Sequence, residues 1–127
     1  MKGDIQTKKI NEIKELLGAE LLCGEELLEN EVYSACCSDM MSDVLAYVKD
    51  QGVLLTGLVN SQVIRTASMM DMVCVVFIRS KNPSLDMIEL ARECGIVIMK
   101  SARRAYEACG ILYSAGLVTP PSEDSYV

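Results

Sequence analysis

The clearest structural signal lies in residues 53–78, which read VLLTGLVNSQVIRTASMMDMVCVVFI. Two short apolar runs, 53–56 and 74–78, flank a segment whose apolar residues recur at helical spacing. Neither run alternates between apolar and polar residues, which indicates strands that are covered on both faces. Two such strands joined by one helix form a β-α-β unit with parallel pairing. We therefore expect a parallel sheet with helices on both faces.

The same pattern extends in both directions along the chain. It predicts an α/β fold with a mostly parallel sheet of about five strands, in one domain over residues 1–118. Residues 119–127 are polar and proline-rich, and we expect a disordered tail there. The predicted strands are 19–23, 32–37, 53–56, 74–78 and 96–99, and the predicted helices are 5–17, 38–50, 61–70, 84–94 and 101–115.

Composition excludes several classes of function. The chain has 127 residues, 12 Lys and Arg against 18 Asp and Glu, a net charge of −6 and no histidine. An acidic chain is a poor binder of nucleic acid or of anionic membranes. Without histidine there is no Ser–His or Cys–His nucleophile pair. No apolar run approaches a membrane span, and the start of the chain does not resemble a signal peptide. We expect a cytoplasmic protein with neither nucleic-acid nor membrane partners.

The six cysteines show no C-x-x-C spacing. In a cytoplasmic chain they are expected to be reduced, buried and apolar in character, although a metal or iron–sulfur site stays open because Cys36 and Cys37 are adjacent. Neighbouring residues of a strand point to opposite faces, so these two do not easily share a metal. Asp39 and Asp43, at i and i+4 of a helix start, could bind a hard cation or act as acid and base. We favour stabilisation of the helix dipole, and predict no metal or cofactor.

Small and polar residues gather where the expected strands end. Ligands of parallel sheets bind at that edge, where helix N-termini converge. The turn from Thr56 to Ser61 places backbone N–H groups at a helix start, which suits an anion, and Arg65 lies one turn further on. The candidate ligand-binding residues are Thr56, Gly57, Asn60, Ser61, Arg65, Lys100 and Ser101, with Ser38 and Asp39 as secondary candidates.

These residues also fit ordinary helix caps and loops. Neither glycine fingerprint for phosphate binding, G-x-G-x-x-G or G-x-x-x-x-G-K-[ST], occurs in the chain. Arg79, Lys81 and Lys100 could add positive charge at the same edge. The residues therefore support a generic anion crevice and name no ligand.

Three stretches carry a resemblance to a known family: CSDMMSDVLA at 37–46, LLTGLVNSQVIRTA at 54–67 and IELARECGI at 88–96. Together with the strand at 75–78, they resemble the DRTGG domain, over roughly residues 5 to 117. The resemblance implies an α/β accessory module, which occurs elsewhere fused to phosphotransacetylase and to CBS-domain pyrophosphatases and is related in fold to the amino-terminal domain of HPr kinase. It implies regulation and subunit contacts, without catalytic residues. The literal Asp-Arg-Thr-Gly-Gly string is absent, and the comparable turn is 56–60.

Three hypotheses follow. The first is a non-catalytic regulatory module that forms a homodimer, with a regulatory protein as a further partner. The second is a sensor that binds a small anionic metabolite or nucleotide at the strand ends. The third, an enzyme using Asp39 and Asp43 with a metal or an activated cysteine, lacks a recognisable catalytic constellation. For a dimer, we expect contact through the exposed side of the second and third helices, which carries Met40, Tyr47 and Met69.

Overall fold

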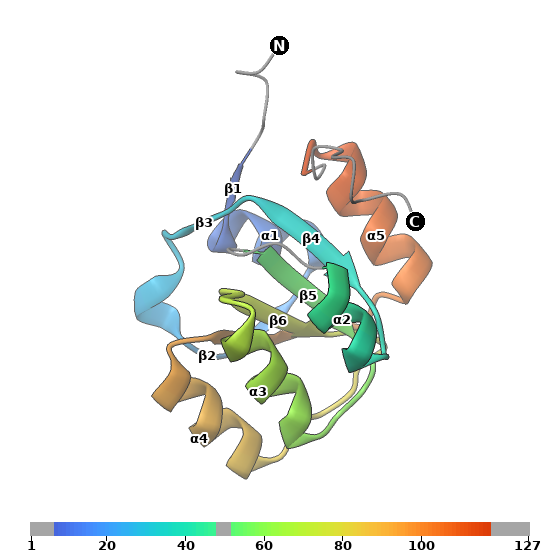
Figure 1. Cartoon of the computed structure of the whole chain (residues 1–127). Helices are drawn as coiled ribbons and strands as arrows, with labels where there is room; N and C mark the ends of the chain where they lie inside the picture. The colour runs from blue at the N-terminus through green and yellow to red at the C-terminus, as the bar shows by residue number, and fades with distance from the viewer. Residues whose placement is uncertain (1–6, 48–51, 118–127) are drawn as a thin grey trace.

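The computed structural model describes residues 7–47 and 52–117. A five-stranded sheet forms the middle layer, in the order β2-β7-β6-β5-β4 (Figure 1). Strands β4 to β7 are parallel, and β2 pairs antiparallel with β7 at one edge. The predicted α/β class and mostly parallel sheet are therefore confirmed. The strands span Glu20–Cys23 (β2), Ser34–Cys37 (β4), Gly52–Thr56 (β5), Cys74–Phe77 (β6) and Val97–Lys100 (β7).

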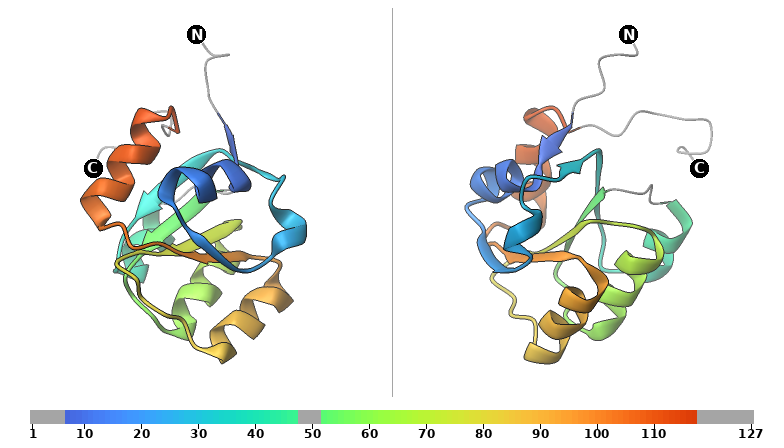
Figure 2. Two further views of the ribbon diagram at one scale, coloured as in Figure 1. Left: turned by 180° about the vertical axis from the view of Figure 1, so that it is seen from behind. Right: turned by 90° about the vertical axis from the view of Figure 1, so that its left-hand side faces the viewer.

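Helices cover both faces of this sheet (Figure 2). From β4 to β7 each crossover moves the chain by one strand in the same direction. Crossovers of one hand and one direction place their helices on one face, and these are α2 (Met41–Tyr47), α3 (Ser61–Met69) and α4 (Leu85–Cys94). The other face is covered by α1 (Ile10–Leu17) and α5 (Ala105–Ser114).

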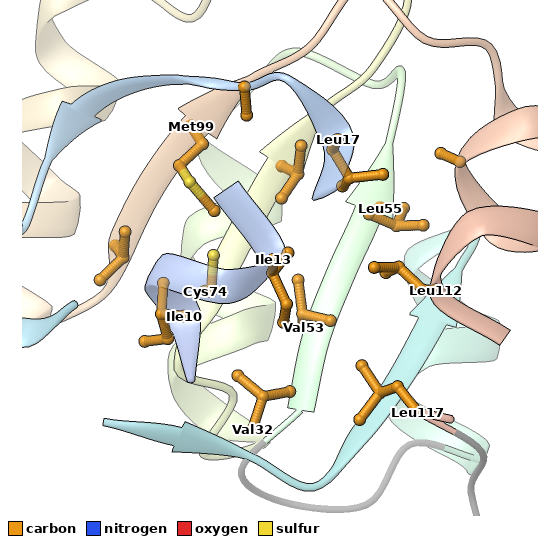
Figure 3. Packing of buried hydrophobic residues seen from close by; sticks show 14 of the residues in the cluster. Ile10, Ile13, Leu17, Val32, Val53, Leu55, Cys74, Met99, Leu112 and Leu117 are labelled. Atoms are coloured by element: carbon orange, nitrogen blue, oxygen red, sulfur yellow. The ribbon is translucent and has the colours of Figure 1, made fainter. Parts of the chain in front are cut away.

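Two hydrophobic cores result, one on each face. Along β5, Val53 and Leu55 pack on the α1 and α5 side, whereas Leu54 packs on the α2 to α4 side. Figure 3 shows the first core, in which Ile13 of α1 and Leu112 of α5 meet these strand residues. Because both faces are covered, every residue of β5 and β6 is buried, which explains their continuous apolar runs.

The structure corrects the N-terminal part of the prediction. The first helix begins at Ile10 instead of residue 5, because Lys8–Lys9 (β1) pairs antiparallel with Glu31–Val32 (β3). The predicted strand 32–37 is broken at Tyr33 into β3 and β4, which belong to different sheets. The loop between β2 and β3 contains one 3-10 turn, Glu25–Leu27 (η2). Residues 5 and 6 lie outside the described residues.

The last helix also differs from its prediction. It begins at Ala105, and Ser101 does not cap it. Ser101 is 2 % exposed, and its hydroxyl donates to the Leu17 carbonyl at 2.8 Å and accepts from the Arg103 N–H at 3.1 Å. This tertiary contact holds residues 101–104 in a non-helical turn. The end of the second helix after Tyr47 and the tail at 119–127 lie outside the described residues.

Other predicted helix ends are confirmed. Gly18 and Gly95 end α1 and α4 in the left-handed conformation, which glycine adopts at little cost. The Asn60 side chain accepts from the Gln62 N–H and caps α3, and Ser84 caps α4 in the same way through Met87.

Candidate functional site

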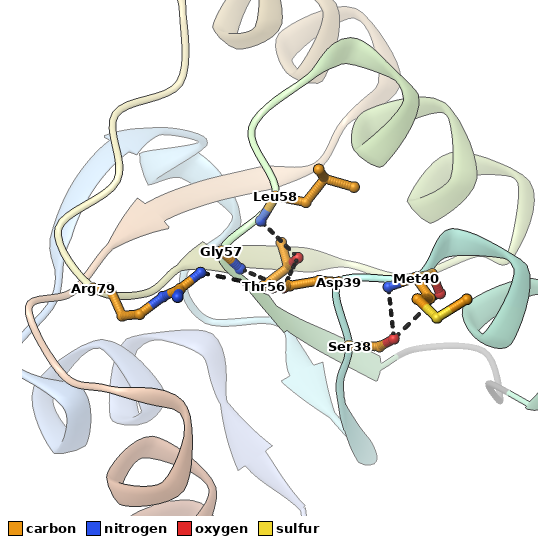
Figure 4. A network of polar contacts seen from close by, with 7 residues as sticks. All are labelled: Ser38, Asp39, Met40, Thr56, Gly57, Leu58 and Arg79. Atoms are coloured by element: carbon orange, nitrogen blue, oxygen red, sulfur yellow. Dashed lines mark hydrogen bonds and ion pairs between the residues drawn. The ribbon is translucent and has the colours of Figure 1, made fainter.

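The carboxyl ends of β4, β5 and β6 bring a set of polar groups together (Figure 4). Asp39 follows β4, and its Oδ1 accepts the Gly57 N–H at 2.8 Å and the Thr56 hydroxyl at 3.0 Å. From the end of β6, Arg79 places Nη2 3.6 Å from Asp39 Oδ2. We call Asp39, Thr56, Gly57 and Arg79 the Asp39 cradle.

The loop that carries Arg79 has an unusual backbone. Arg79 and Ser80 are both left-handed, with φ of 60° and 58°. Their N–H groups donate to the carbonyls of Arg103 (2.8 Å) and Ser101 (2.9 Å), which offsets part of the cost of this conformation. The guanidinium lies over Gly57, where an added Cβ would overlap Nη2. Glycine at 57 is what permits this close approach.

The cradle stabilises a negative charge. The Gly57 N–H lowers the pKa of Asp39 most, and the Thr56 hydroxyl and the Arg79 guanidinium lower it further, against a partial desolvation that raises it. The Asp39 side chain is 56 % exposed, so water screens the ion pair. At neutral pH the ionised Asp39 carboxylate therefore accepts the hydrogen bond of the Gly57 N–H, at the turn where the sequence predicts a bound anion.

The other predicted ligand residues are more scattered. Asn60 and Ser61 lie at the start of α3, where Asn60 serves as the cap, and Arg65 is exposed one turn along. Lys100 donates to the Asn82 side chain, and Ser101 faces α1. Ser38 closes its own turn, because its hydroxyl accepts the Met40 N–H at 2.9 Å. Of the predicted set, the structure brings together Asp39, Thr56 and Gly57.

The proposed pairing of Asp39 with Asp43 on one helix is wrong. Asp39 lies before α2, which begins at Met41, and its carboxylate turns to the end of the neighbouring strand. From its position in the sequence Arg79 is predicted only as a nearby positive charge, and its place in the cradle is not predicted. The sequence places Arg79 just after β6 and Gly57 just after the neighbouring strand β5, which could have indicated that the two residues lie close together. No local pattern indicates that the backbone of Arg79 is left-handed.

The cysteines depart in part from the expectation of burial. Cys23 and Cys74 are buried, whereas Cys37, Cys94 and Cys109 are exposed, and all six are free thiols. Over residues 7–47 and 52–117, no three groups from His, Cys, Asp and Glu gather in a way that could hold a metal ion. In the same ranges, no helix is long and apolar enough to cross a bilayer.

Comparison with solved structures shows a match over nearly the whole chain. The CBS and DRTGG domains of the regulatory region of Clostridium perfringens pyrophosphatase, solved with the activator diadenosine tetraphosphate, superpose with a TM-score of 0.69 at 16 % identity. The match covers 96 % of this chain and 53 % of that one, so this chain spans about half its length. The fold is consistent with a DRTGG domain.

The structural match supports the resemblance inferred from residues 37–46, 54–67 and 88–96 at the level of the fold. Comparisons with protein-family models and with curated proteins found no match.

Proposed function

We propose that this chain is a non-catalytic regulatory domain of DRTGG type that acts in the cytoplasm as a homodimer. The likeness to the regulatory region of a pyrophosphatase supports the regulatory role. Self-association is supported by helix α5, which is largely apolar and yet largely exposed.

Helix α5 reads AYEACGILYS and has a single charged residue, Glu107. Only Ala108 and Leu112 of this helix are buried, whereas Tyr106 is 94 % and Tyr113 66 % exposed. A helix that is apolar around most of its circumference is normally covered on more than one side. We define the α5 face by Tyr106, Gly110 and Tyr113. Its exposed apolar area makes it a candidate surface for binding a partner.

A second copy fits the α5 face for reasons of charge. The chain carries a net charge of −6, so most surfaces of two copies repel each other. On α5 the one acid, Glu107, forms a 2.9 Å ion pair with Arg103 and is locally neutralised. Tyrosines combine a large apolar area with a polar tip and are common in protein interfaces. In a two-fold dimer this face can meet its own copy without an unpaired like charge.

The side of α2 and α3 that the sequence suggests for the dimer stays a second candidate. Met40 and Met69 are 60 % and 68 % exposed there. The side chain of Tyr47 lies outside the described part of the chain. Single exposed apolar residues are common on monomers, so we favour the α5 face.

The test is light-scattering mass after gel filtration at low micromolar concentration. We expect a dimer for the wild type, a monomer for Tyr113→Asp, and a dimer for the matched control Met69→Asp. A monomeric wild type would contradict the homodimer. If Met69→Asp dissociates while Tyr113→Asp does not, the interface lies on α2 and α3 instead.

The Asp39 cradle favours a second function, a sensor of a small anionic metabolite or nucleotide. The internal carboxylate shows that Gly57, Thr56 and Arg79 stabilise a negative charge at this edge. An external anion would displace Asp39 and take over its hydrogen bonds. The nucleotide activator of the structurally similar region makes nucleotides the first compounds to test.

Thermal shift across nucleotides, diadenosine tetraphosphate and phosphometabolites tests this function. A ligand at about 100 times its dissociation constant stabilises the fold by about 2.7 kcal/mol. For a bound anion, Asp39→Ala should strengthen binding because it removes the competing carboxylate, whereas Arg79→Gln should weaken it. Arg92→Gln is the matched control, since Arg92 lies in the last turn of α4, outside the cradle and outside the predicted ligand-binding set. The absence of a shift in both the wild type and Asp39→Ala would exclude the sensor.

A further inference from the structure

Two of the exposed thiols lie on elements that pack against each other. Cys37 ends β4, an edge strand of the sheet, and Cys109 lies in α5. The two elements are in contact. Side chains alternate along β4, so Cys37 shares the side of Ala35, which packs into the core beneath α1 and α5. Cys36 points to the opposite core, beneath α2 to α4.

The helix geometry brings Cys109 to the same side. Ala105, Ala108 and Leu112 of α5 belong to the core between this helix and the sheet. Cys109 is four residues after Ala105 and three before Leu112, which places it on the flank of this inward stripe. The end of β4 and the flank of α5 thus present one thiol each.

The pKa of the Cys37 thiol agrees with this placement. Although the Cys37 residue is exposed as a whole, partial desolvation of its thiol raises the pKa of Cys37 to about 12, and the neighbouring Cys109 thiol adds to the increase. Cys37 therefore holds its proton at neutral pH. The other four thiols do not share this arrangement: Cys23 and Cys74 are buried, Cys36 is half-buried against the opposite core, and Cys94 lies on α4 across the sheet.

Metal binding does not account for this pair. In the described ranges no third His, Cys, Asp or Glu completes a metal site with any two of these groups. Two neighbouring thiols without a metal have one common reaction, oxidation to a disulfide.

We propose that Cys37 and Cys109 form an intramolecular disulfide when the protein meets a small disulfide oxidant such as oxidised glutathione. The bond ties α5 to the edge strand β4 and makes the pair a redox modification site. This inference does not depend on self-association, because both cysteines belong to the same chain.

The reaction proceeds in two exchanges. The thiolate of the exposed Cys109 attacks one sulfur of oxidised glutathione, forms a mixed disulfide and expels one glutathione thiolate. Capped in this way, Cys109 no longer repels a charge on Cys37. The Cys37 sulfur then attacks the Cys109 sulfur, its proton passes to the leaving thiolate, and a second reduced glutathione departs. Two protein thiols are oxidised and one glutathione disulfide is reduced to two thiols.

The test uses the full chain, reduced, desalted and incubated with oxidised glutathione. We expect an intact mass lower by two hydrogens. Non-reducing tryptic mapping should then give a link between the peptides 15–49 and 105–127, of which the second contains only Cys109. The first contains Cys23, Cys36 and Cys37, so single variants assign the bond. The link should survive in Cys36→Ala and disappear in Cys37→Ala.

Thermal unfolding gives an independent readout. A bond between positions 37 and 109 closes a long loop, and we expect oxidation to raise the Tm by about 10 °C in the wild type and in Cys36→Ala. No increase is expected in Cys37→Ala or, should that variant fail to fold, in Cys109→Ser, whose site is exposed. The reaction is repeated on Tyr113→Asp, which we expect to be monomeric, so that a second copy bound to α5 cannot shield Cys109 from the oxidant.

Three results would overturn the proposal. They are a glutathione adduct that persists on Cys109 without a link, a link through Cys23 or Cys36, and a bond between two chains.

Discussion

Gly57 and Gly24 offer a paired test of how the cradle is built. Both glycines face another segment closely, but a methyl group added at each would meet a different kind of obstacle. At Gly57 the new Cβ would meet the guanidinium of Arg79, the far end of a flexible side chain, and φ is not left-handed. At Gly24 φ is 93°, and the Cβ would lie 3.0 Å from the Cα and 2.9 Å from the Cγ2 of Val97.

The magnitudes follow from these contacts. In Gly57→Ala the Arg79 side chain swings away and loses an exposed ion pair with Asp39, which contributes about 0–1 kcal/mol. Alanine gives the unfolded chain fewer conformations than glycine does, which stabilises the folded state by about 0.4–1 kcal/mol and offsets this loss. In Gly24→Ala the left-handed conformation costs about 1–2 kcal/mol, and crowding against β7, which lies between β2 and β6, adds about 1–3 kcal/mol.

The assay is urea unfolding at one protein concentration, followed by far-UV circular dichroism. We expect Gly57→Ala within about 1 kcal/mol of the wild type, and Gly24→Ala destabilised by about 2–5 kcal/mol, with a midpoint lower by about 1 M or more. Equal losses in the two variants would refute the reasoning, because they would show that Arg79 cannot leave its place over residue 57.

Three further predictions concern single groups. The folded pKa of Asp39 lies below its value of 3.8 in the unfolded chain, so the ionised carboxylate stabilises the fold above about pH 4, and this contribution is lost as pH falls through the folded pKa. The difference in urea midpoint between wild type and Asp39→Asn should therefore shrink on acidification. A difference that stays constant with pH would show that the charge of Asp39 does not stabilise the fold. Ser101→Ala leaves the Leu17 carbonyl without its 2.8 Å donor and should cost about 1–3 kcal/mol in the same assay, whereas a neutral result would mean that water replaces the hydroxyl. Leu112→Ala removes a side chain that is 1 % exposed and should cost about 2–5 kcal/mol; a loss below 1 kcal/mol would show that α5 is loosely packed.

Local sequence patterns were sufficient for the fold class. The apolar runs at 53–56 and 74–78 read as covered strands because both of their faces are in fact buried, by α1 and α5 on one side and by α2 to α4 on the other. Helix ends at Gly18, Gly95 and Asn60 were predictable because a cap depends on residues within one turn. The edge that carries the polar residues followed from the parallel topology alone.

The partners of individual polar side chains were decided by the tertiary structure. Asp39 is equally suited by composition to a helix start and to the Gly57 N–H, and only the parallel pairing of β4 with β5 brings that N–H within reach. Ser101 would cap a helix by local rules, but Leu17, 84 positions earlier in the chain, offers its carbonyl instead. The sequence determined which segments are strands and helices, because periodicity and caps act over a few residues. The contacts of Asp39 and Ser101 depend on segments that meet only after the sheet has formed, and no local pattern records them.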